Sequence, residues 1–263
     1  MDVLIHTTNS FKGVIVDRDR LPPAPAAFER QLGHSIEVWK ADGFLTVWLE
    51  VPIDLSDLIP IGVKAGFEFH HAGMDYVMMT FRLVKDTFIP SYATHYIGAG
   101  GVVINHKDEL LVVCERYRRD NKPSYKLPGG ALQSGEHLQD CVIREVKEET
   151  GIETVFDALV CFRHSHGYRF SKSDIYFVCR LKPKSQDITI QQEEIEECLW
   201  MPICKYLESE YVHAFNKSIV KAALGSPGVV PVEMDSYPDR KEREFFMPKS
   251  LSLDSRTSSS NSL

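Results

Sequence analysis

The sequence has no long apolar run, no paired-cysteine motif and no excess of basic residues, and each absence excludes a class of protein. Uninterrupted apolar runs, such as residues 110–114, are far shorter than the ~18 residues that a membrane-spanning helix needs. The six cysteines form no Cys-x-x-Cys pair and have no histidines at zinc-finger spacing, so we interpret them as reduced core thiols. With 30 Lys and Arg against 37 Asp and Glu, the net charge of -7 argues against general binding to nucleic acid or to anionic membranes.

What is present is typical of a folded globular protein. Hydrophobic residues make up 43% and charged residues 25%, which excludes wholesale disorder. At roughly 150 residues per domain, 263 residues indicate two compact units, or one unit with long appendages. Residues 1–10 contain no Lys or Arg, unlike a secretory signal or an Arg-rich transit peptide, so we expect a cytoplasmic and/or nuclear protein.

Residues 1–90 carry the pattern of a small α/β domain. Phe28, Leu32, Ile36 and Trp39 recur at spacings of three and four, which predicts a helix with one apolar face. Segments 11–17, 44–51 and 76–83 are predicted strands. Residues 91–96 are predicted to be a linker. The paired histidines at 70 and 71 and a third at 95 have no fitting Cys or acidic ligand, so we interpret them as packing or hydrogen-bonding side chains, not as a zinc site.

Residues 97–225 form a second pattern, in which strands outnumber helices. We expect strands at 97–105, 110–117, 155–164 and 173–181, and helices at 136–150 and about 205–223. This alternation predicts a mixed-sheet α/β or α+β sandwich. Residues 226–263 are expected to be a disordered tail, because the pattern dissolves there and seven of the last fourteen residues are serine.

One 23-residue window, from Gly130 to Ile152, holds the densest set of chemically informative residues. On a helix, Glu145, Glu148 and Glu149 fall within an arc of about 100°, because spacings of three and four are same-face neighbours. That arc borders the apolar stripe of the same helix, so the three carboxylates should be partly desolvated. A divalent cation would offset their repulsion, and an all-oxygen site suits Mg²⁺ or Mn²⁺ better than zinc.

The Leu-Pro-Gly-Gly loop that ends at Gly130 precedes this helix, and Gly151 follows it. Gly129 and Gly130 permit positive φ angles and close backbone approach, so the loop can present amides and carbonyls to a metal or a phosphate. Gly151 occupies the position at which glycine commonly ends a helix. The loop, the helix and Gly151 are therefore predicted to form one structural unit.

At every defining position this window matches the signature of the Nudix hydrolases, so residues 97–225 resemble a Nudix domain. The resemblance implies a mixed-sheet α/β/α sandwich and metal-dependent hydrolysis of a nucleoside diphosphate linked to a further moiety, X. It implies metal ligation by Glu145, Glu148, Glu149 and the Gly130 carbonyl, and Mg²⁺ or Mn²⁺ as the metal. By the same pattern, Arg144 orients a carboxylate, and Glu136 supports the loop and in some members holds a second metal.

The order of the two halves resembles the Nudix subgroup with a pre-Nudix N-terminal domain, which includes plant ADP-ribose/NADH pyrophosphatases and an animal growth-factor antisense protein. For the plant members it implies cleavage of ADP-ribose or NADH to AMP and a phosphorylated moiety. For the animal member it implies an uncertain substrate and an association with control of cell proliferation. A weakly active or inactive regulatory binding protein on the Nudix scaffold is therefore the alternative. The subgroup also makes a homodimer plausible.

Two features outside the window are candidates for substrate recognition and for proton transfer. Arg116 and Arg118, on one face of a predicted strand, and Gly129 with Gly130 could contact phosphates; ordinary surface charges are the alternative for the arginines. The proton acceptor for the attacking water could be Glu148 or Glu149 in the helix, or Glu194 or Glu197 in the acidic run before Trp200; an ordinary solvated loop is the alternative for that run. His164, His166 and Arg169 form a second polar cluster, which could contact the substrate or consist of ordinary surface side chains.

Overall fold

The computed structural model describes residues 1–117, 122–237, 239 and 241–248. The chain divides into two compact units, Met1–Thr94 and His95–Leu263, which are considered separately. Strand β6 begins at His95, so the boundary falls inside the segment 91–96 that was expected to be a linker. In the described part of the chain, no helix combines the length and apolar character needed to span a bilayer.

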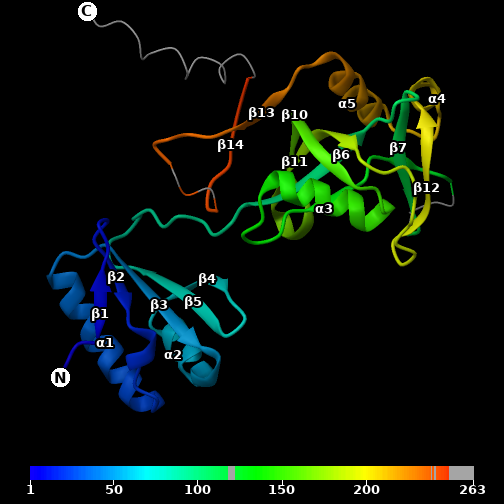
Figure 1. The fold of residues 1–263 in the computed structure, drawn as a ribbon. Helices are drawn as coiled ribbons and strands as arrows, with labels where there is room; N and C mark the ends of the chain where they lie inside the picture. The colour runs from blue at the N-terminus through cyan, green and yellow to red at the C-terminus, as the bar shows by residue number, and fades with distance from the viewer. Residues whose placement is uncertain (118–121, 238, 240, 249–263) are drawn as a thin grey trace, which may run out of the picture. The chain divides into compact units, whose positions relative to one another are not determined.

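The N-terminal unit is a five-stranded sheet in the order β1-β2-β3-β5-β4, with helices α1 and α2 packed against it (Figure 1). Strands β2 and β3 are parallel and the other neighbours are antiparallel. The elements are β1 (His6–Thr8), β2 (Gly13–Val16), η1 (Arg18–Arg20), α1 (Pro25–Ala41), β3 (Thr46–Pro52), η2 (Ile53–Leu58), α2 (Ile59–Lys64), β4 (Glu68–Ala72) and β5 (Tyr76–Arg82).

Helix α1 begins at Pro25, where the missing N–H is harmless because the first-turn amides have no partner within the helix. The expected apolar face is confirmed: Phe28, Leu32 and Trp39 are fully buried and Ile36 is nearly so. They pack with the inward side chains of the sheet into a hydrophobic cluster of residues from this unit. The N-terminal unit therefore has its own core.

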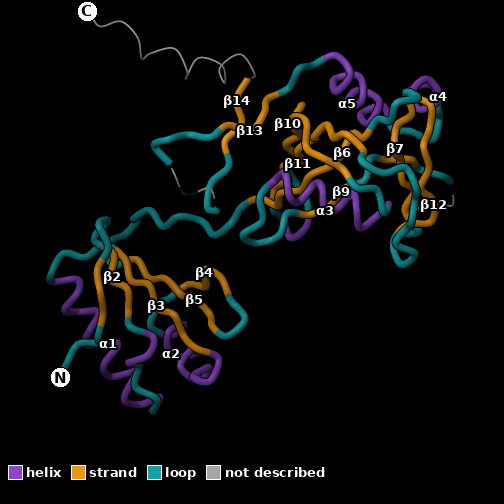
Figure 2. Tube along the Cα trace, in the orientation of Figure 1, coloured by secondary structure: helices purple, strands orange, loops and turns teal. Residues whose placement is uncertain are grey.

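The C-terminal unit contains a six-stranded mixed sheet, β14-β13-β10-β11-β6-β9, and a three-stranded sheet, β12-β7-β8 (Figure 2). Strands β6 and β11 are parallel and the other pairs are antiparallel. The elements are β6 (His95–Val103), β7 (Glu109–Glu115), β8 (Tyr125–Lys126), β9 (Gly129–Ala131), α3 (Leu138–Thr150), β10 (Thr154–Ser165), η3 (Arg169–Ser171), β11 (Ser173–Pro183), β12 (Ile195–Pro202), α4 (Ile203–Glu208), α5 (Ala214–Gly225), β13 (Val229–Val232) and β14 (Phe245–Pro248).

The central strands β6 and β11 contribute side chains to hydrophobic clusters on both faces of the sheet. Val103 and Cys179 belong to the cluster that packs under α3, whereas their neighbours Val102 and Val178 belong to the cluster that contains α4 and α5. Successive side chains of a strand point to opposite faces, so one run of apolar residues contributes to both clusters. The result is the mixed α/β sandwich with an N-terminal α/β domain that the sequence predicts.

Three local expectations need correction. The single helix expected at about 205–223 is two helices, because the backbone leaves helical geometry at Ser209 and α5 restarts at the capping residue His213. The helix expected from Glu136 begins at Leu138, since Glu136 lies in the preceding loop. The disordered tail expected over 226–263 is wrong for its described part up to Pro248, where β13 and β14 form a hairpin.

Candidate active site

Helix α3 presents the predicted carboxylates beside the loop that contains Gly129 and Gly130. Its apolar stripe, including Val142 and Val146, is fully buried against the sheet, so the helix cannot rotate without exposing that stripe. The neighbouring face carries Arg144, Glu145, Glu148 and Glu149. The site is therefore built where a buried helix face meets its polar edge.

Glu149 is the most deeply buried of these carboxylates, with 6% of the residue exposed. Its Oε2 accepts a hydrogen bond of 2.9 Å from the amide of Gly129. Burial raises the pKa of Glu149 to about 7, against the opposing influence of Lys126 and of the Gly129 amide. The helix is thus attached to the glycine loop through a carboxyl group whose pKa lies near neutrality.

Arg144 connects three other carboxylates. Its guanidinium donates to both oxygens of Glu136, from Nε at 2.7 Å and from Nη2 at 3.0 Å. Its Nη1 donates to Glu145 Oε1 and to Glu148 Oε2, both at 2.9 Å. The hydrogen bonds from Arg144 lower the pKa of Glu136, whose Oε2 also accepts from the Gln133 amide at 3.0 Å. Arg144 therefore holds together the glutamates of the loop and of the helix.

Gly129 and Gly130 allow the loop to approach both β6 and the helix. Gly129 has φ +152°, and an added Cβ would lie 2.2 Å from the carbonyl oxygen of Ala99. At Gly130 an added Cβ would lie 2.5 Å from Oε2 of Glu145, so the carboxylate occupies the space of a side chain. Burial raises the pKa of Glu145 in spite of its hydrogen bond to Arg144. Neither glycine could be replaced without moving the site.

The chemistry of this donor set fits a hard divalent cation. Carboxylate and carbonyl oxygens are the ligands that Mg²⁺ and Mn²⁺ prefer, and a neighbouring cation would favour the ionised forms of the buried Glu145 and Glu149. Among the described residues, no three His, Cys, Asp or Glu side chains stand in a ready-made metal site. One nitrogen of Arg144 contacts both Glu145 and Glu148.

The loop that leads into the acidic run contacts the same helix through its backbone. The Gln191 amide lies 3.4 Å from the Glu149 carbonyl oxygen, in the loop that leads into β12. Arg116 holds this loop: its amide donates to the Glu194 carbonyl at 2.8 Å and its Nε donates to the Gln192 carbonyl at 2.9 Å. Glu197 accepts a hydrogen bond of 2.7 Å from the Tyr125 hydroxyl. Arg118 lies outside the described residues.

Two residues at the site were not singled out from the sequence. Lys126 forms an ion pair with Glu115 and is the nearby cation that opposes the raised pKa of Glu149. Tyr176 is partly buried, and its hydroxyl lies 2.8 Å from the position that a Cβ on Gly129 would take. Lys126 directly precedes the Leu-Pro-Gly-Gly loop, which could have drawn attention to it. Tyr176 comes from β11, and no local pattern marks it.

The histidines at 70, 71, 95, 164 and 166 make hydrogen-bond or ring contacts with one another or with neighbouring side chains. His70 Nδ1 lies 2.7 Å from His71 Nδ1, and the His71 ring stacks on Tyr92 at 4.2 Å between centroids. In the C-terminal unit, His95 Nε2 lies 2.9 Å from His164 Nε2, and His166 Nδ1 lies 2.8 Å from the Ser173 hydroxyl. These contacts agree with the expected packing and hydrogen-bonding roles.

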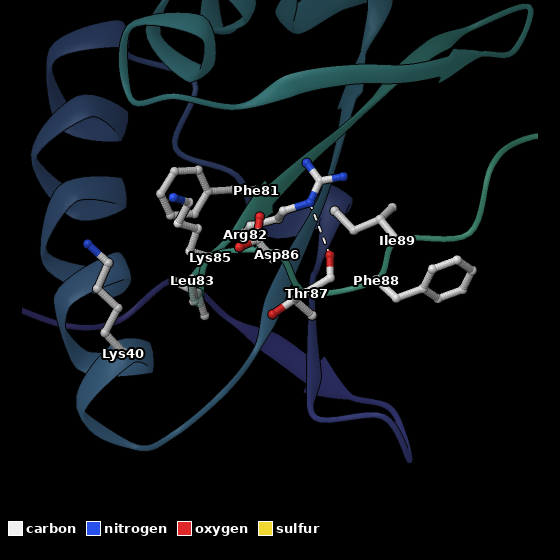
Figure 3. A pocket seen from close by; sticks show the side chains of 9 residues that line it. All are labelled: Lys40, Phe81, Arg82, Leu83, Lys85, Asp86, Thr87, Phe88 and Ile89. Atoms are coloured by element: carbon white, nitrogen blue, oxygen red, sulfur yellow. Dashed lines mark hydrogen bonds between the residues drawn. The ribbon is translucent and has the colours of Figure 1, made fainter.

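Two hollows in the described part of the chain lie away from the glutamates. One, of about 790 Å³, belongs to the N-terminal unit and is lined by residues such as Lys40, Phe81, Arg82 and Phe88 (Figure 3). The other, of about 480 Å³, lies between the C-terminal hairpin and the first residues of α3. Neither hollow contains the glutamates of the candidate active site.

Comparison with known proteins gave matches over both units. A family model described as NUDIX domain matches residues 94–223, and one described as Nudix hydrolase domain matches residues 4–83. Nudix hydrolase 8 of Arabidopsis thaliana is 40% identical over 207 residues, covering 78% of this chain and 56% of that protein. Nudix hydrolase 2 of the same plant is 40% identical over 216 residues, covering 81% of this chain and 77% of the relative.

An animal protein and solved structures also match. The human protein named nucleoside diphosphate-linked moiety X motif 6 is 35% identical over 210 residues, covering 78% of this chain and 65% of that protein. Among solved structures, a NUDIX hydrolase from Nitrosomonas europaea has a TM-score of 0.43 at 20% identity, covering 49% of this chain and 88% of the other. The NUDIX domain of Shewanella oneidensis NrtR, complexed with ADP ribose, has a TM-score of 0.44 at 16% identity, covering 51% and 88%.

Proposed function

We propose that this chain, which belongs to the Nudix hydrolase family, cleaves the pyrophosphate of an ADP-X compound, with ADP-ribose and NADH as the first candidates. Nudix hydrolases act on nucleoside diphosphates linked to a further moiety, and they generally use divalent metal ions. The products would be AMP and the phosphorylated moiety X. The observation that carries the proposal is the convergence of Glu136, Glu145 and Glu148 on Arg144, beside the glycine loop.

The residues that would hold Mg²⁺ or Mn²⁺ are those of the metal-ligand set inferred from the sequence: Gly130, Glu136, Glu145, Glu148 and Glu149. A bound divalent cation would neutralise part of the pyrophosphate charge and stabilise the charge that develops at phosphorus. The chain has a net charge of -7, so such compensation matters more here than in a basic enzyme.

The chain's own residues orient these groups and move the proton. Arg144 donates hydrogen bonds to carboxylates of both the loop and the helix and so fixes their relative positions. Catalysis depends on such pre-organised groups. The attacking water loses a proton to a carboxylate as its oxygen bonds to phosphorus, and the bridging P–O bond breaks to release the phosphate ester. Glu149 is a candidate for the base, because its carboxyl group contacts the glycine loop of the site. Glu148, Glu194 and Glu197 are the other candidates for the base.

Substrate contacts are proposed for Gly129 and Gly130 and for the arginines near the end of β7. The Nε of Arg116 already donates to the acidic loop, so this residue would act by shaping that loop and by its positive charge. Arg118 is retained as a phosphate-binding candidate.

The decisive experiment is a product-resolved assay of the purified protein with Mg²⁺ and then Mn²⁺. The panel contains ADP-ribose, NADH, NAD⁺, FAD, coenzyme A, dinucleoside polyphosphates and capped RNA. We expect one preferred substrate that yields AMP, with turnover lost in Glu148→Gln. Negligible turnover of every compound would overturn the proposal and favour the regulatory alternative.

A second assay identifies the proton acceptor in the acidic loop. Glu194→Gln and Glu197→Gln, alone and combined, should lower kcat by about 10²-fold if one of them is the base. An unchanged kcat in all three variants would exclude the loop and leave Glu148 and Glu149. Asp187→Asn is a matched control, because Asp187 is an exposed acidic residue in the connection before β12.

A further inference from the structure

The catalytic helix α3 lacks a cap from its own N-terminal neighbour. His137, the residue before the helix, has extended geometry (φ -78°, ψ 151°) and makes no side-chain capping hydrogen bond. The first amides of an α-helix have no partner within the helix, so they need an acceptor from elsewhere. Leu138, the first residue of α3, is buried, which limits access of water to its amide.

Glu244 supplies the missing acceptors from more than a hundred residues further along the chain. Its Oε2 accepts from the Leu138 amide at 2.8 Å, and its Oε1 accepts from the Gln139 amide at 3.2 Å. The side chain of Glu244 is only 13% exposed. A carboxylate at this position also complements the partial positive charge of a helix N-terminus. One side chain therefore accepts hydrogen bonds from two amides and also places a negative charge at the positive end of the helix dipole.

The C-terminal hairpin, formed by β13 and β14, holds Glu244 in place. Strand β14 starts at the next residue, Phe245, and pairs with β13, which joins β10 at the Leu159–Val229 pair. The Phe246 ring lies 5.7 Å from that of Phe156 and packs against the core under α3. The hairpin lies beyond residue 223, where the Nudix-domain match ends.

Helix α3 is thus attached to the rest of the unit at both ends. Near its C-terminus, Glu149 accepts from the Gly129 amide; at its N-terminus, the first two amides donate to Glu244. Arg144, Glu145 and Glu148 lie between these two attachments. A helix held at one end only could tilt about that end, which would displace the carboxylates from the glycine loop.

We propose that Glu244 is a positioning residue for the hydrolysis reaction: its carboxylate caps α3 and sets the helix against the Gly129–Gly130 loop. This inference rests on the proposed hydrolase function. Glu244 acts through the helix and contacts no reacting atom. The C-terminal hairpin is accordingly part of the catalytic apparatus and not a dispensable extension.

The test compares Glu244→Ala, Glu244→Gln and the control Glu242→Ala in the full chain. Glu242 is an exposed acidic residue two positions before Glu244, so its variant controls for the loss of one negative charge in the same segment. Glu244→Gln keeps an uncharged acceptor oxygen and serves as the conservative variant. Three quantities are measured: kcat and KM with Mg²⁺, hydrogen exchange of the Leu138 and Gln139 amides, and Mn²⁺ affinity by electron paramagnetic resonance without substrate.

We expect Glu244→Ala to lower kcat about ten-fold with little change in KM, because the displaced carboxylates affect the chemical step more than substrate binding. Exchange at the two amides should rise about five-fold, as for the loss of a helix cap. The kcat and the amide exchange rates of Glu244→Gln should lie between those of Glu244→Ala and those of the wild type. Glu242→Ala should match the wild type.

An unchanged kcat in Glu244→Ala, with faster amide exchange, would overturn the inference, because the cap would then be structural only. If Glu244→Ala does not fold, Glu244→Gln decides by the same criteria. If the wild type hydrolyses no compound, the proposed function fails. The Mn²⁺ affinity then still tests whether Glu244 positions the carboxylates. Weaker Mn²⁺ binding in Glu244→Ala would support the positioning of the carboxylates by the cap, and equal binding would overturn it.

Discussion

At the scale of single residues, Arg144 determines how the carboxylates of the site can coexist. Glu145, Glu148 and Glu149 at the rim of a buried helix face repel one another, and burial further disfavours the charged forms of Glu145 and Glu149. The planar guanidinium offers several donors in a fixed geometry, so it can contact Glu136, Glu145 and Glu148 at once. A lysine ammonium carries the same charge but cannot reproduce this set of contacts.

We therefore expect Arg144→Lys to lower kcat by about ten- to a hundred-fold, because charge is retained while the carboxylates lose their common donor. The measurement is steady-state hydrolysis of the preferred substrate with Mg²⁺. Arg18→Lys is a matched control, since Arg18 pairs with Glu50 and Asp75 in the N-terminal unit. If the kcat of Arg144→Lys stays within about two-fold of the kcat of the control, the several donors of the guanidinium are not needed for hydrolysis.

At the scale of elements, the C-terminal unit is held together by charged side chains that join strands to segments distant in sequence. Arg180 on β11 donates to Asp157 on β10 at 2.6 Å. It also donates to the carbonyls of Ala223 and Ser226, at the end of α5, at 2.9 Å and 2.7 Å. Lys182 pairs with the other Asp157 oxygen at 2.7 Å. This network fixes the point from which the C-terminal hairpin departs.

The same network predicts a pH dependence of stability. Burial acts to raise the pKa of Asp157, but Lys182 and Arg180 outweigh it and hold the pKa below its usual range. Stability from this pair is therefore present at neutral pH and is lost as pH falls through the lowered pKa. Asp157→Asn should lower the free energy of unfolding by about 1–2 kcal/mol at pH 7.

Urea unfolding of wild type and Asp157→Asn at a series of pH values tests this. The difference between them should shrink as pH falls below the ordinary pKa of Asp, and it should vanish once the pH is below the lowered pKa of the folded state, where the wild-type carboxyl is protonated. Asp187→Asn, with its exposed side chain, should differ little from the wild type throughout. A pH-independent difference for Asp157→Asn would mean that packing, not charge, explains the effect.

At the scale of the whole molecule, the two units have separate hydrophobic cores. The buried cluster of the N-terminal unit contains only residues of that unit, and the two clusters of the C-terminal unit contain only residues after Thr94. A substitution in one core should therefore leave the packing of the other unchanged. Units with their own cores are the ordinary basis for independent unfolding.

Leu32→Ala, a truncation of a fully buried side chain, should destabilise the N-terminal unit by about 2–5 kcal/mol. Calorimetry should show one of two transitions moving to lower temperature while the other stays in place. Val142→Ala, in the core under α3, is the matched variant and should move the other transition. Movement of both transitions in each variant would show that the two units unfold as one.

Local spacing along the chain was sufficient to predict most elements and the core of the site. The helical face of α1, the stripe of α3 and the convergence of Glu145, Glu148 and Glu149 follow from the geometry of a helix, because residues three and four apart share a face. The family resemblance came from the window between Gly130 and Ile152, and the mixed α/β sandwich was predicted from the alternation of strands and helices over residues 97–225. None of these required knowledge of contacts between residues distant in sequence.

Contacts between distant residues account for the rest. The raised pKa of Glu149 depends on burial under the glycine loop, and Tyr176 reaches that loop only because β11 pairs with β6. Glu244 caps α3 although the sequence between them shows no signal of the pairing, and the hairpin that carries it was expected to be disordered. Such features depend on which segments pack together in the folded protein. The spacing of residues within one segment does not specify those contacts.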